Sequence, residues 1–477
     1  MVSSPIDAGV VVVYMLAMVG LGYWGYSKSE SLDDYLVAGR NVPMWMFVPV
    51  MSAVILGGAA TVGGGGLGYE SGISGAWLVI SLGLGTVVLG VLISTNLANL
   101  RAYSLGEVLE RRFDRYSGTI GALIAGVYAL TIATTQTIAV GKVLSVLFDF
   151  NGTTMIVAAG VIIIGYTALG GMVTVTLTDF VQWCIMTVGI FLLAIPLGLQ
   201  SIGGFSTLSA ELDPSFFDPT AIGLDAIWGF VLLYVLGIMI GQDIWQRVFT
   251  AESPEVARTG TIVAGGYAIV YGLATAFLGM IALVLLPDLG DPELALPLLV
   301  LDVIPVGLSG LVLAGFISAM MSTADSALLA SSTLFTNDVY KRFVDPDASD
   351  RRYTAVSRAF IVVLGVVMVY AAVAIGDVVT ALTLAYDLLT GCIFVPVFGA
   401  FFWRGATWQG ALTSILGSAA AVVAALAHFG FASNYPIYVG LATSFVLFVG
   451  VSVVTGPPAR DKLDRWLGGV DSSSTLD

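Results

Sequence analysis

The stretch from Ala314 to Phe343 is apolar enough over its first two-thirds to cross a lipid bilayer, yet it is rich in hydroxyl side chains. On a helix, five small residues fall on one stripe at spacings of three and four, namely Ala319, Ser322, Thr323, Ser326 and Ala330. Such a stripe lets a second helix approach closely and directs oxygens at whatever lies between the two helices. Serine and threonine also join helices by simple hydrogen bonds, so the stripe alone leaves a packing role and an ion-binding role open.

The composition of the chain places this stretch in a polytopic membrane protein. Hydrophobic residues make up 57% and charged residues 10% of the 477 residues, a balance that soluble domains do not have. The net charge of −14 disfavours a nucleic-acid partner. With one histidine in the sequence, and two cysteines that both lie in apolar runs, a histidine-built metal site is excluded and zinc or disulfide chemistry is not indicated. The lipid bilayer is therefore the expected surrounding.

Apolar runs of about 20 residues predict thirteen transmembrane helices. Their expected bounds are 6–26, 44–69, 75–100, 117–148, 153–170, 175–199, 225–249, 256–286, 307–335, 353–375, 378–403, 408–429 and 437–454. If the N-terminus lies outside, every one of the 18 Lys and Arg residues except Lys142 falls in or beside a cytoplasmic segment, and the outer loops carry acids. The charge pattern thus predicts a multi-pass protein of the cell membrane with a cytoplasmic C-terminus.

Glycines interrupt two of the predicted spans. The tract from Leu56 to Gly68 disfavours a continuous helix because each glycine costs about 1 kcal/mol relative to alanine, and the span at 225–249 contains Gly237 and Gly241. In a chain of two five-helix repeats, these breaks fall in the first helix of each repeat. Matched breaks point to a transporter binding site, because unwound backbone leaves carbonyl oxygens for a cation. Close helix packing is the alternative explanation of the same glycines.

Four stretches, in order along the chain, carry a resemblance to a known family. They are DYLVAGR at 34–40, GGMVTVTLTDFVQ at 170–182, WQR at 245–247 and AMMSTADS at 319–326. On these motifs the chain resembles the sodium:solute symporter family, whose members carry proline, pantothenate, sugars, sialic acid or choline with sodium. The resemblance covers nearly the whole chain. It implies an all-α fold of the leucine-transporter type, a five-plus-five inverted repeat with one extra helix in front and two behind.

That fold implies a division into segments and a function. An extra helix and a cytoplasmic loop are expected over 1–43, the first repeat over 44–200, the second over 201–404, and two helices with a cytoplasmic tail over 405–477. The resemblance implies sodium-coupled symport of a small organic solute by alternating access, without enzymatic activity. A monomer is expected to be able to transport, and the oligomeric state stays open. Proton coupling in the same fold, a passive channel and an intramembrane protease are the alternatives.

The resemblance implies a sodium site built from two helices. It assigns the ion to the backbone carbonyls of Ala53, Leu56 and Ala319 and to the hydroxyls of Ser322 and Thr323. Neutral oxygens at a helix break suit this hard cation because they bind it without trapping it. Asp179 matches an acidic residue that members place near this site, where it draws the ion inward or helps form a second sodium site. Capping the start of the sixth span is the structural alternative for Asp179.

The resemblance places the solute between the two breaks. The implied contacts are Ile55, Ala60, Trp77, Tyr234, Gly237, Gln242, Thr383 and Tyr386. Sugar carriers have polar side chains at several positions where this chain has Ile55, Ala60 and Tyr234. The tryptophans of an aromatic cage for choline are replaced at Ile55, Ile132 and Gly241. The expected cargo is an amino acid such as proline, or a related carboxylate or quaternary ammonium solute.

Overall fold

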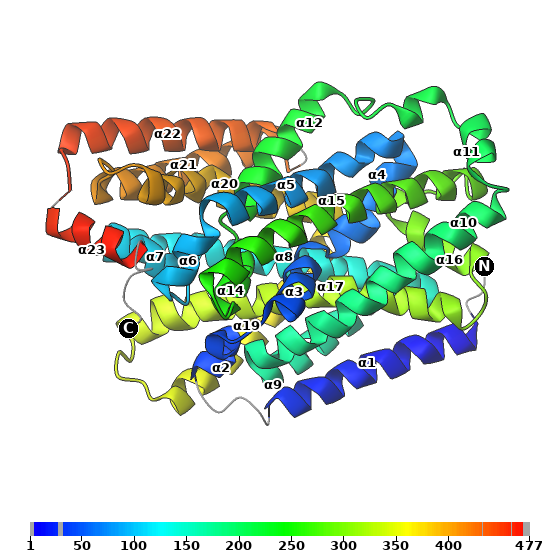
Figure 1. Ribbon diagram of the computed structural model, residues 1–477, viewed down its shortest axis with the longest axis horizontal. Coiled ribbons are helices and arrows are strands. Elements are labelled where there is room, and N and C mark those ends of the chain that lie inside the picture. The colour runs from blue at the N-terminus through cyan, green and yellow to red at the C-terminus, as the bar shows by residue number, and fades with distance from the viewer. Residues whose placement is uncertain (1–3, 27–31, 432, 459, 471–477) are drawn as a thin grey trace.

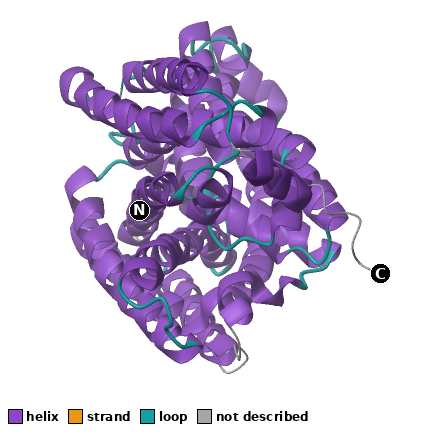
Figure 2. Ribbon diagram, turned by 90° about the vertical axis from the view of Figure 1, so that its left-hand side faces the viewer, coloured by secondary structure: helices purple, strands orange, loops and turns teal. Residues whose placement is uncertain are grey.

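The computed structural model describes residues 4–26, 32–431, 433–458 and 460–470. Over these residues the chain is helical, with one isolated bridge between Val42 and Ala251 and no strand. The helices run roughly along the long axis of the molecule (Figure 1), and a view from one end shows them packed side by side (Figure 2). The predicted all-α fold is confirmed.

The N-terminal half begins with one long helix and continues through short and long ones. In the following bounds, η marks a segment of 3-10 or π helix. The segments are α1 (Pro5–Tyr26), α2 (Leu32–Val37), η1 (Ala38–Arg40), α3 (Met44–Ile55), η2 (Ala59–Gly63), α4 (Gly64–Ser71), η3 (Gly72–Ala76), α5 (Trp77–Leu92), α6 (Ser94–Leu100), α7 (Leu105–Arg112), α8 (Arg115–Phe148), α9 (Gly152–Thr187), η4 (Val188–Ala194) and α10 (Ile195–Ser201). Side chains satisfy the free amides at two helix starts, where Ser104 accepts from the N–H of Glu107 and Asp114 from that of Ser117.

The C-terminal half contains most of the long helices. Its segments are α11 (Phe205–Glu211), η5 (Pro214–Phe217), α12 (Leu224–Phe230), η6 (Val231–Val235), α13 (Leu236–Ile238), α14 (Gln242–Thr250), α15 (Pro254–Leu285), η7 (Pro292–Leu294), α16 (Ala295–Val303), α17 (Leu308–Thr333), η8 (Leu334–Tyr340), α18 (Lys341–Phe343), α19 (Asp350–Ile375), α20 (Val378–Phe402), α21 (Trp408–Phe429), α22 (Tyr435–Thr455) and α23 (Arg460–Val470). Ser253 and Asp377 cap the starts of α15 and α20 by accepting backbone N–H groups.

Length and apolarity identify the helices that can cross a membrane. Nine helices of the described residues qualify, or ten if the bent pair Leu224–Ile238 and Gln242–Thr250 is one span. Three shorter apolar helices accompany them, at Pro5–Leu21, Met44–Ile55 and Gly152–Gly165. Every predicted span coincides with helical residues over most of its length. The count of thirteen crossings itself stays a prediction.

The helical segment α9 covers the predicted span 153–170 and the first part of the span 175–199, which continues through η4 into α10. Ile156 packs against Gly141 of α8, and Met186 packs against Gly315 of α17. Because α8 and α17 run antiparallel, Gly141 and Gly315 lie at a similar depth in the bundle. A straight helix would hold Ile156 and Met186 about 45 Å apart. The chain therefore reverses direction within α9, as two separate spans require.

The helix α17 forms the centre of the bundle. In the span Leu308–Phe343, 94% of an apolar stretch of 18 residues is buried, against 28% of the corresponding stretch in the outer helix α19. Its neighbours are α1, α3, α8, α9, α14 and α19. The hydroxyls that make this stretch a poor lipid anchor therefore face protein, which removes the cost of exposing them to hydrocarbon.

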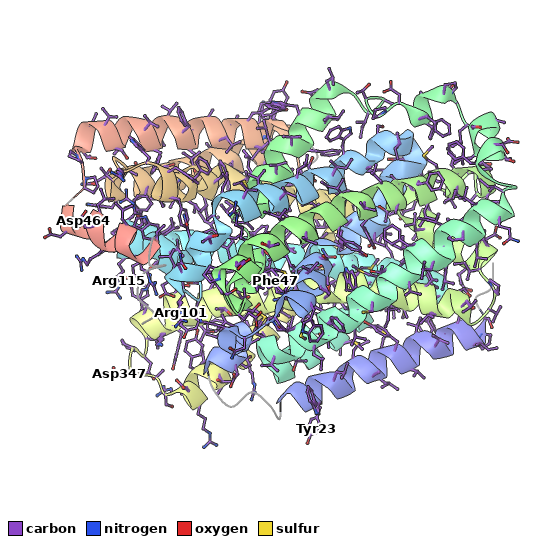
Figure 3. All side chains as sticks on the ribbon, in the orientation of Figure 1. Tyr23, Phe47, Arg101, Arg115, Asp347 and Asp464 are labelled. Atoms are coloured by element: carbon purple, nitrogen blue, oxygen red, sulfur yellow. The ribbon has the colours of Figure 1, made fainter. Side chains whose placement is uncertain are left out.

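The two ends of the bundle differ in what they carry. The helix α1 begins at one end of the long axis, and α23 lies at the opposite end (Figure 1). Figure 3 places Arg101, Arg115 and Asp347 toward the end where α23 and its Asp464 lie. The start of α1 and the helix α23 thus lie at opposite ends of the bundle, which agrees with an odd number of crossings between them.

Candidate ion and solute site

The first predicted break lies at Leu56 and Gly57, between α3 and η2. Leu56, a predicted sodium ligand, leaves the helix with φ −95° and ψ 44°. A Cβ at Gly57 would overlap the side-chain amide of Gln136 and lie 2.6 Å from the hydroxyl oxygen of Thr323, so glycine lets both side chains approach the break. The N–H of Gly58 donates to Oε1 of Gln136, which satisfies an amide that the break sets free.

The rest of the glycine tract is wound as helix, in η2 and α4. The expectation that the tract disfavours helix therefore holds only at its first residues. A Cβ at Gly68 would lie 2.5 Å from Cα of Ala276, so glycine there lets α4 press directly on α15. Close packing, the alternative left open by the sequence, accounts for this glycine.

Four of the predicted sodium ligands converge where α3 ends beside α17. The Ser322 hydroxyl donates to the carbonyl of Ala53 at 2.9 Å, and the Thr323 hydroxyl donates to that of Val54 at 3.0 Å. Both hydroxyl oxygens also lie 3.2 Å from the carbonyl oxygen of Ala319. All of these residues are buried. The arrangement gathers neutral oxygens from two helices into one small volume.

Asp179 is connected to this cluster of oxygens through Arg247. Its Oδ2 accepts from Nη2 of Arg247 at 2.8 Å, and both side chains are fully buried. Arg247 also donates to the hydroxyl of Ser326, which in turn donates to the carbonyl of Ser322. Oδ1 of Asp179 accepts no hydrogen bond from the described residues, so Asp179 does not cap the start of the sixth predicted span. A chain of contacts thus joins Asp179 to the stripe on α17.

A second break bends the chain by 45° between α13 and α14. Met239 to Gly241 form the turn, and the carbonyl of Met239 accepts from Nε1 of Trp245 at 2.8 Å. The two predicted breaks are therefore both present, one in each half of the chain.

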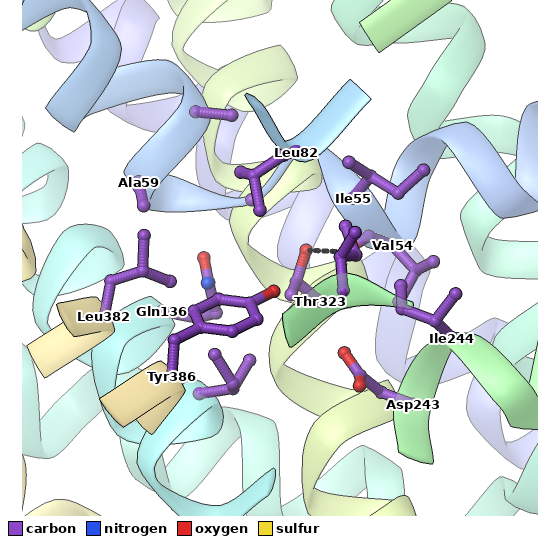
Figure 4. A pocket seen from close by; sticks show the side chains of 14 residues that line it. Val54, Ile55, Ala59, Leu82, Gln136, Asp243, Ile244, Thr323, Leu382 and Tyr386 are labelled. Atoms are coloured by element: carbon purple, nitrogen blue, oxygen red, sulfur yellow. Dashed lines mark hydrogen bonds between the residues drawn. The ribbon is translucent and has the colours of Figure 1, made fainter. Parts of the chain in front are cut away.

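A cavity of about 20 Å³ lies between the two breaks (Figure 4). Its lining residues are Val54, Ile55, Gly57, Ala59, Ala60, Leu82, Ile132, Gln136, Ile238, Asp243, Ile244, Thr323, Leu382 and Tyr386. This volume holds little more than one water molecule, so the protein is closed around the site. Thr323 lines the cavity and contacts the α3 carbonyls, which joins the two sites through one side chain.

Three of the predicted solute contacts line the cavity, namely Ile55, Ala60 and Tyr386. Three others lie behind the Tyr386 ring. Tyr234 packs edge-on against it with ring centroids 5.3 Å apart, and the Tyr234 hydroxyl lies 3.2 Å from that of Thr383. A Cβ at Gly237 would overlap the same ring. These three residues support Tyr386 rather than the cavity itself.

The structure places the remaining two predicted contacts elsewhere. Nε1 of Trp77 donates to the carbonyl of Pro219 at 2.8 Å, in the loop before α12. Oε1 of Gln242 accepts from the N–H of Leu105 at 2.6 Å, and its Nε2 donates to the carbonyl of Tyr103 at 3.1 Å. Neither side chain lines the cavity. Gln242 instead ties the start of α14 to α7.

Sequence reasoning missed two polar residues of the cavity, Gln136 and Asp243. Each carries a readable signal, since Gln136 is an amide within an apolar span and Asp243 is an acid that follows the glycines of the second break. Polar groups at membrane depth are costly unless they have partners, which makes such residues candidates for a site.

Comparison with known proteins places the chain in a family. A model described as the sodium:solute symporter family matches residues 35–417. The high-affinity proline transporter PutP of Bacillus subtilis is 25% identical over 94% of this chain and 98% of its own length. A sodium/glucose cotransporter of Vibrio parahaemolyticus is 25% identical over 87% of this chain and 84% of its own length.

Solved structures share the fold. A Na⁺-coupled sialic acid symporter in a substrate-bound outward-open state superposes with a TM-score of 0.78 at 20% identity, over 96% of this chain and 99% of its own. Mhp1, a nucleobase-cation-symport transporter, superposes in a closed conformation with a TM-score of 0.56 at 14% identity, over 91% and 98%.

A helical bundle of this fold, with matched breaks around a buried cluster of oxygens, defines an ion-coupled secondary transporter. The chain belongs to the sodium:solute symporter family. Its coupling ion is sodium, and its cargo is a small organic solute.

Proposed function

We propose that sodium binds where the end of α3 meets α17. The ligands are the carbonyls of Ala53, Leu56 and Ala319 and the hydroxyls of Ser322 and Thr323. The observation that carries the proposal is the approach of the two hydroxyls to the α3 carbonyls, at 2.9 and 3.0 Å. A cation among these oxygens takes the hydroxyl lone pairs and replaces the hydrogen bonds that now join the two helices.

Coupling to the solute follows from shared structure. The end of α3 supplies both the carbonyls of the ion site and the walls Val54 and Ile55 of the cavity, and Thr323 belongs to both sites. An ion that fixes the end of α3 therefore prepares the neighbouring cavity, and by linkage the solute favours ion binding to the same extent. The inside-negative potential adds about 2.3 kcal/mol per charge per 100 mV for inward movement.

Alternating access carries sodium and the solute across the membrane. We propose that the protein opens the cavity to the outside, closes around sodium and solute, and then opens inward, without catalysing a chemical reaction. The N-terminus lies outside and the C-terminus in the cytoplasm. The cargo is an amino acid such as proline, or a related carboxylate or quaternary ammonium solute, which fits the apolar walls and the names of the proline-carrying relatives.

Replacing Ser322 and Thr323 by alanine tests the ion site. The sodium concentration that half-saturates thermal stabilisation of the purified protein, with potassium keeping the ionic strength constant, is expected to rise about tenfold or more, because two ligands of roughly five are lost. The matched control is Thr137→Ala on α8, whose buried hydroxyl bonds to the Ala133 carbonyl of its own helix. An unchanged sodium requirement in the double variant contradicts the assignment.

A further inference from the structure

The acid Asp243 brings a negative charge to the solute cavity. Its side chain is 2% exposed and lies in the first turn of α14, just after the second break. Figure 4 shows the carboxylate directed into the cavity, on the side of Tyr386 and Thr323. Among the lining residues, all of them in the described part of the chain, no other side chain is acidic and none is basic.

The carboxylate of Asp243 accepts a hydrogen bond but forms no ion pair among the described residues. Its Oδ1 accepts from the hydroxyl of Tyr128 at 3.3 Å. The first turn of α14 adds the positive end of a helix dipole, which favours an ionised acid there. Among the residues that the structure describes, no ion pair includes Asp243. Arg247, one turn further along α14, is paired with Asp179 instead.

The other walls suit the apolar part of a small cation. The Tyr386 ring lies edge-on to the rings of Tyr128 and Tyr234, with centroids 5.4 and 5.3 Å away. Aromatic rings beside a carboxylate attract ammonium groups. The amide oxygen of Gln136 is already bonded to the N–H of Gly58, which leaves few groups for the hydroxyls of a sugar.

We propose that the transported solute carries a cationic nitrogen, which binds beside Asp243, so that the cargo is a small organic cation or a zwitterion. A solute that is only anionic would place a second negative charge next to Asp243, and a neutral polyol would leave the carboxylate without a countercharge. This inference rests on the proposed function, because it concerns the solute that sodium accompanies, and it selects within the solute classes named there.

Pairs of solutes that differ only in the charged nitrogen test the proposal on the unaltered protein. The pairs are proline with cyclopentanecarboxylate, glycine betaine with 3,3-dimethylbutanoate, and choline with 3,3-dimethylbutanol. Thermal stabilisation is measured in sodium and in potassium. At least one nitrogen-containing member is expected to stabilise the protein in sodium while its carbon analogue does not. Equal stabilisation by an analogue, or no stabilisation by any of the three nitrogen compounds, overturns the proposal.

The substitution Asp243→Asn removes the charge and keeps the shape. Binding of the active compound is expected to weaken about tenfold or more, because a charge-assisted contact is lost. The control Asp218→Asn makes the same change in an exposed loop, where Asp218 accepts from the N–H of Thr220. Unchanged binding in Asp243→Asn overturns the proposal, as does a variant that alters sodium dependence but keeps the solute preference, which would indicate an ion ligand.

The outcomes separate this inference from the function on which it rests. Sodium alone, with potassium as the comparison, is expected to stabilise the protein whether or not any solute binds. If that stabilisation is present and depends on Ser322 and Thr323, while no cationic compound binds, the sodium site stands and the solute inference fails. If sodium has no effect, the failure lies with the proposed function.

Discussion

At the scale of single residues, the buried pair of Asp179 and Arg247 is the feature that sequence analysis foresaw least. Asp179 was expected to act on sodium through its charge, but Arg247 balances that charge at 2.8 Å. Its connection to the ion site runs through Arg247 and Ser326. The arginine was visible in the sequence only as part of the WQR motif, because nothing local reveals which carboxylate a distant helix presents to it.

The substitution Asp179→Asn leaves the Arg247 guanidinium buried without a countercharge. The free energy of unfolding is expected to fall by about 3–5 kcal/mol, the usual cost of breaking a buried ion pair. The thermal midpoint of the purified variant measures this loss. The double variant Asp179→Asn with Arg247→Gln removes both charges and is expected to recover much of the stability. A single variant as stable as the unaltered protein would show that the pair does not carry this energy.

Residue-level predictions were best where one helix face decided the outcome. That Ser322 and Thr323 share one face of α17 could be predicted because a continuous helix fixes which side chains share a stripe. The sequence analysis assigned a solute contact to Gln242, but in the structure its neighbour Asp243 lines the cavity. Successive residues of a helix point about 100° apart, and the place where a broken helix restarts sets which one faces the site.

At the scale of elements, a cluster of charges joins three segments at the end of the bundle opposite α23. Nζ of Lys142 on α8 donates to Oδ2 of Asp291 at 2.7 Å and to the carboxylate of Glu293 in η7. Glu293 also accepts from the N–H groups of Val378 and Val379, which begin α20. The one basic residue that departed from the predicted charge separation is therefore a partner for the outer acids.

The stability of this cluster is expected to depend on pH through Glu293. Burial raises the pKa of Glu293 above its ordinary value, although Lys142 opposes the shift and the nearby acids Asp291 and Asp377 add to it. A raised pKa in the folded protein means that the stabilisation is present below the ordinary glutamate pKa and is lost as the pH rises through the raised value. The thermal midpoint is expected to fall over that interval, and Glu293→Gln is expected to flatten the fall.

The exposed residue Glu211, at the end of α11, supplies the comparison for this measurement. The substitution Glu211→Gln is expected to leave the pH profile unchanged. If Glu293→Gln also leaves it unchanged, the burial of Glu293 does not control the stability of the cluster.

Most elements could be predicted because spans are long apolar runs, whose signal is strong. Their interruptions were harder to predict. The glycine tract breaks only at Leu56 and Gly57, since its later glycines pack α4 against α15, and the sequence does not reveal which glycines meet a neighbour. The two spans at 153–170 and 175–199 were predicted as separate apolar runs, and the packing of Ile156 and Met186 agrees with a reversal between them.

At the scale of the whole molecule, the proposed orientation follows from the basic residues at one end of the bundle. A reporter fused after Pro458, at the end where α22 leads to α23, is expected to be cytoplasmic. Protease accessibility or a compartment-specific fluorescent reporter in intact cells measures this. A reporter inserted in the loop between α10 and α11 is expected to read outside. The same reading at both positions would contradict the odd number of crossings predicted between them.

The overall fold could be predicted from four short motifs spread over residues 34–326, and the family match supports that prediction. The division into segments at 43, 200 and 404 stays a prediction, because two repeats that pack against each other around α17 leave no gap in the structure to mark where one ends. The volume of the solute cavity could not be predicted at all, since it depends on how far the whole bundle has closed.

The narrowness of the cavity has a consequence for inhibition. A solute does not fit into a space of about 20 Å³, so its binding must shift the population away from this conformer. An antibody fragment that recognises the closed shape at either end of the bundle would therefore oppose solute by mass action while touching none of the lining residues. Its potency would decline as the solute concentration rises, so an inhibitor bound far from the cavity would show the kinetics of a competitive inhibitor.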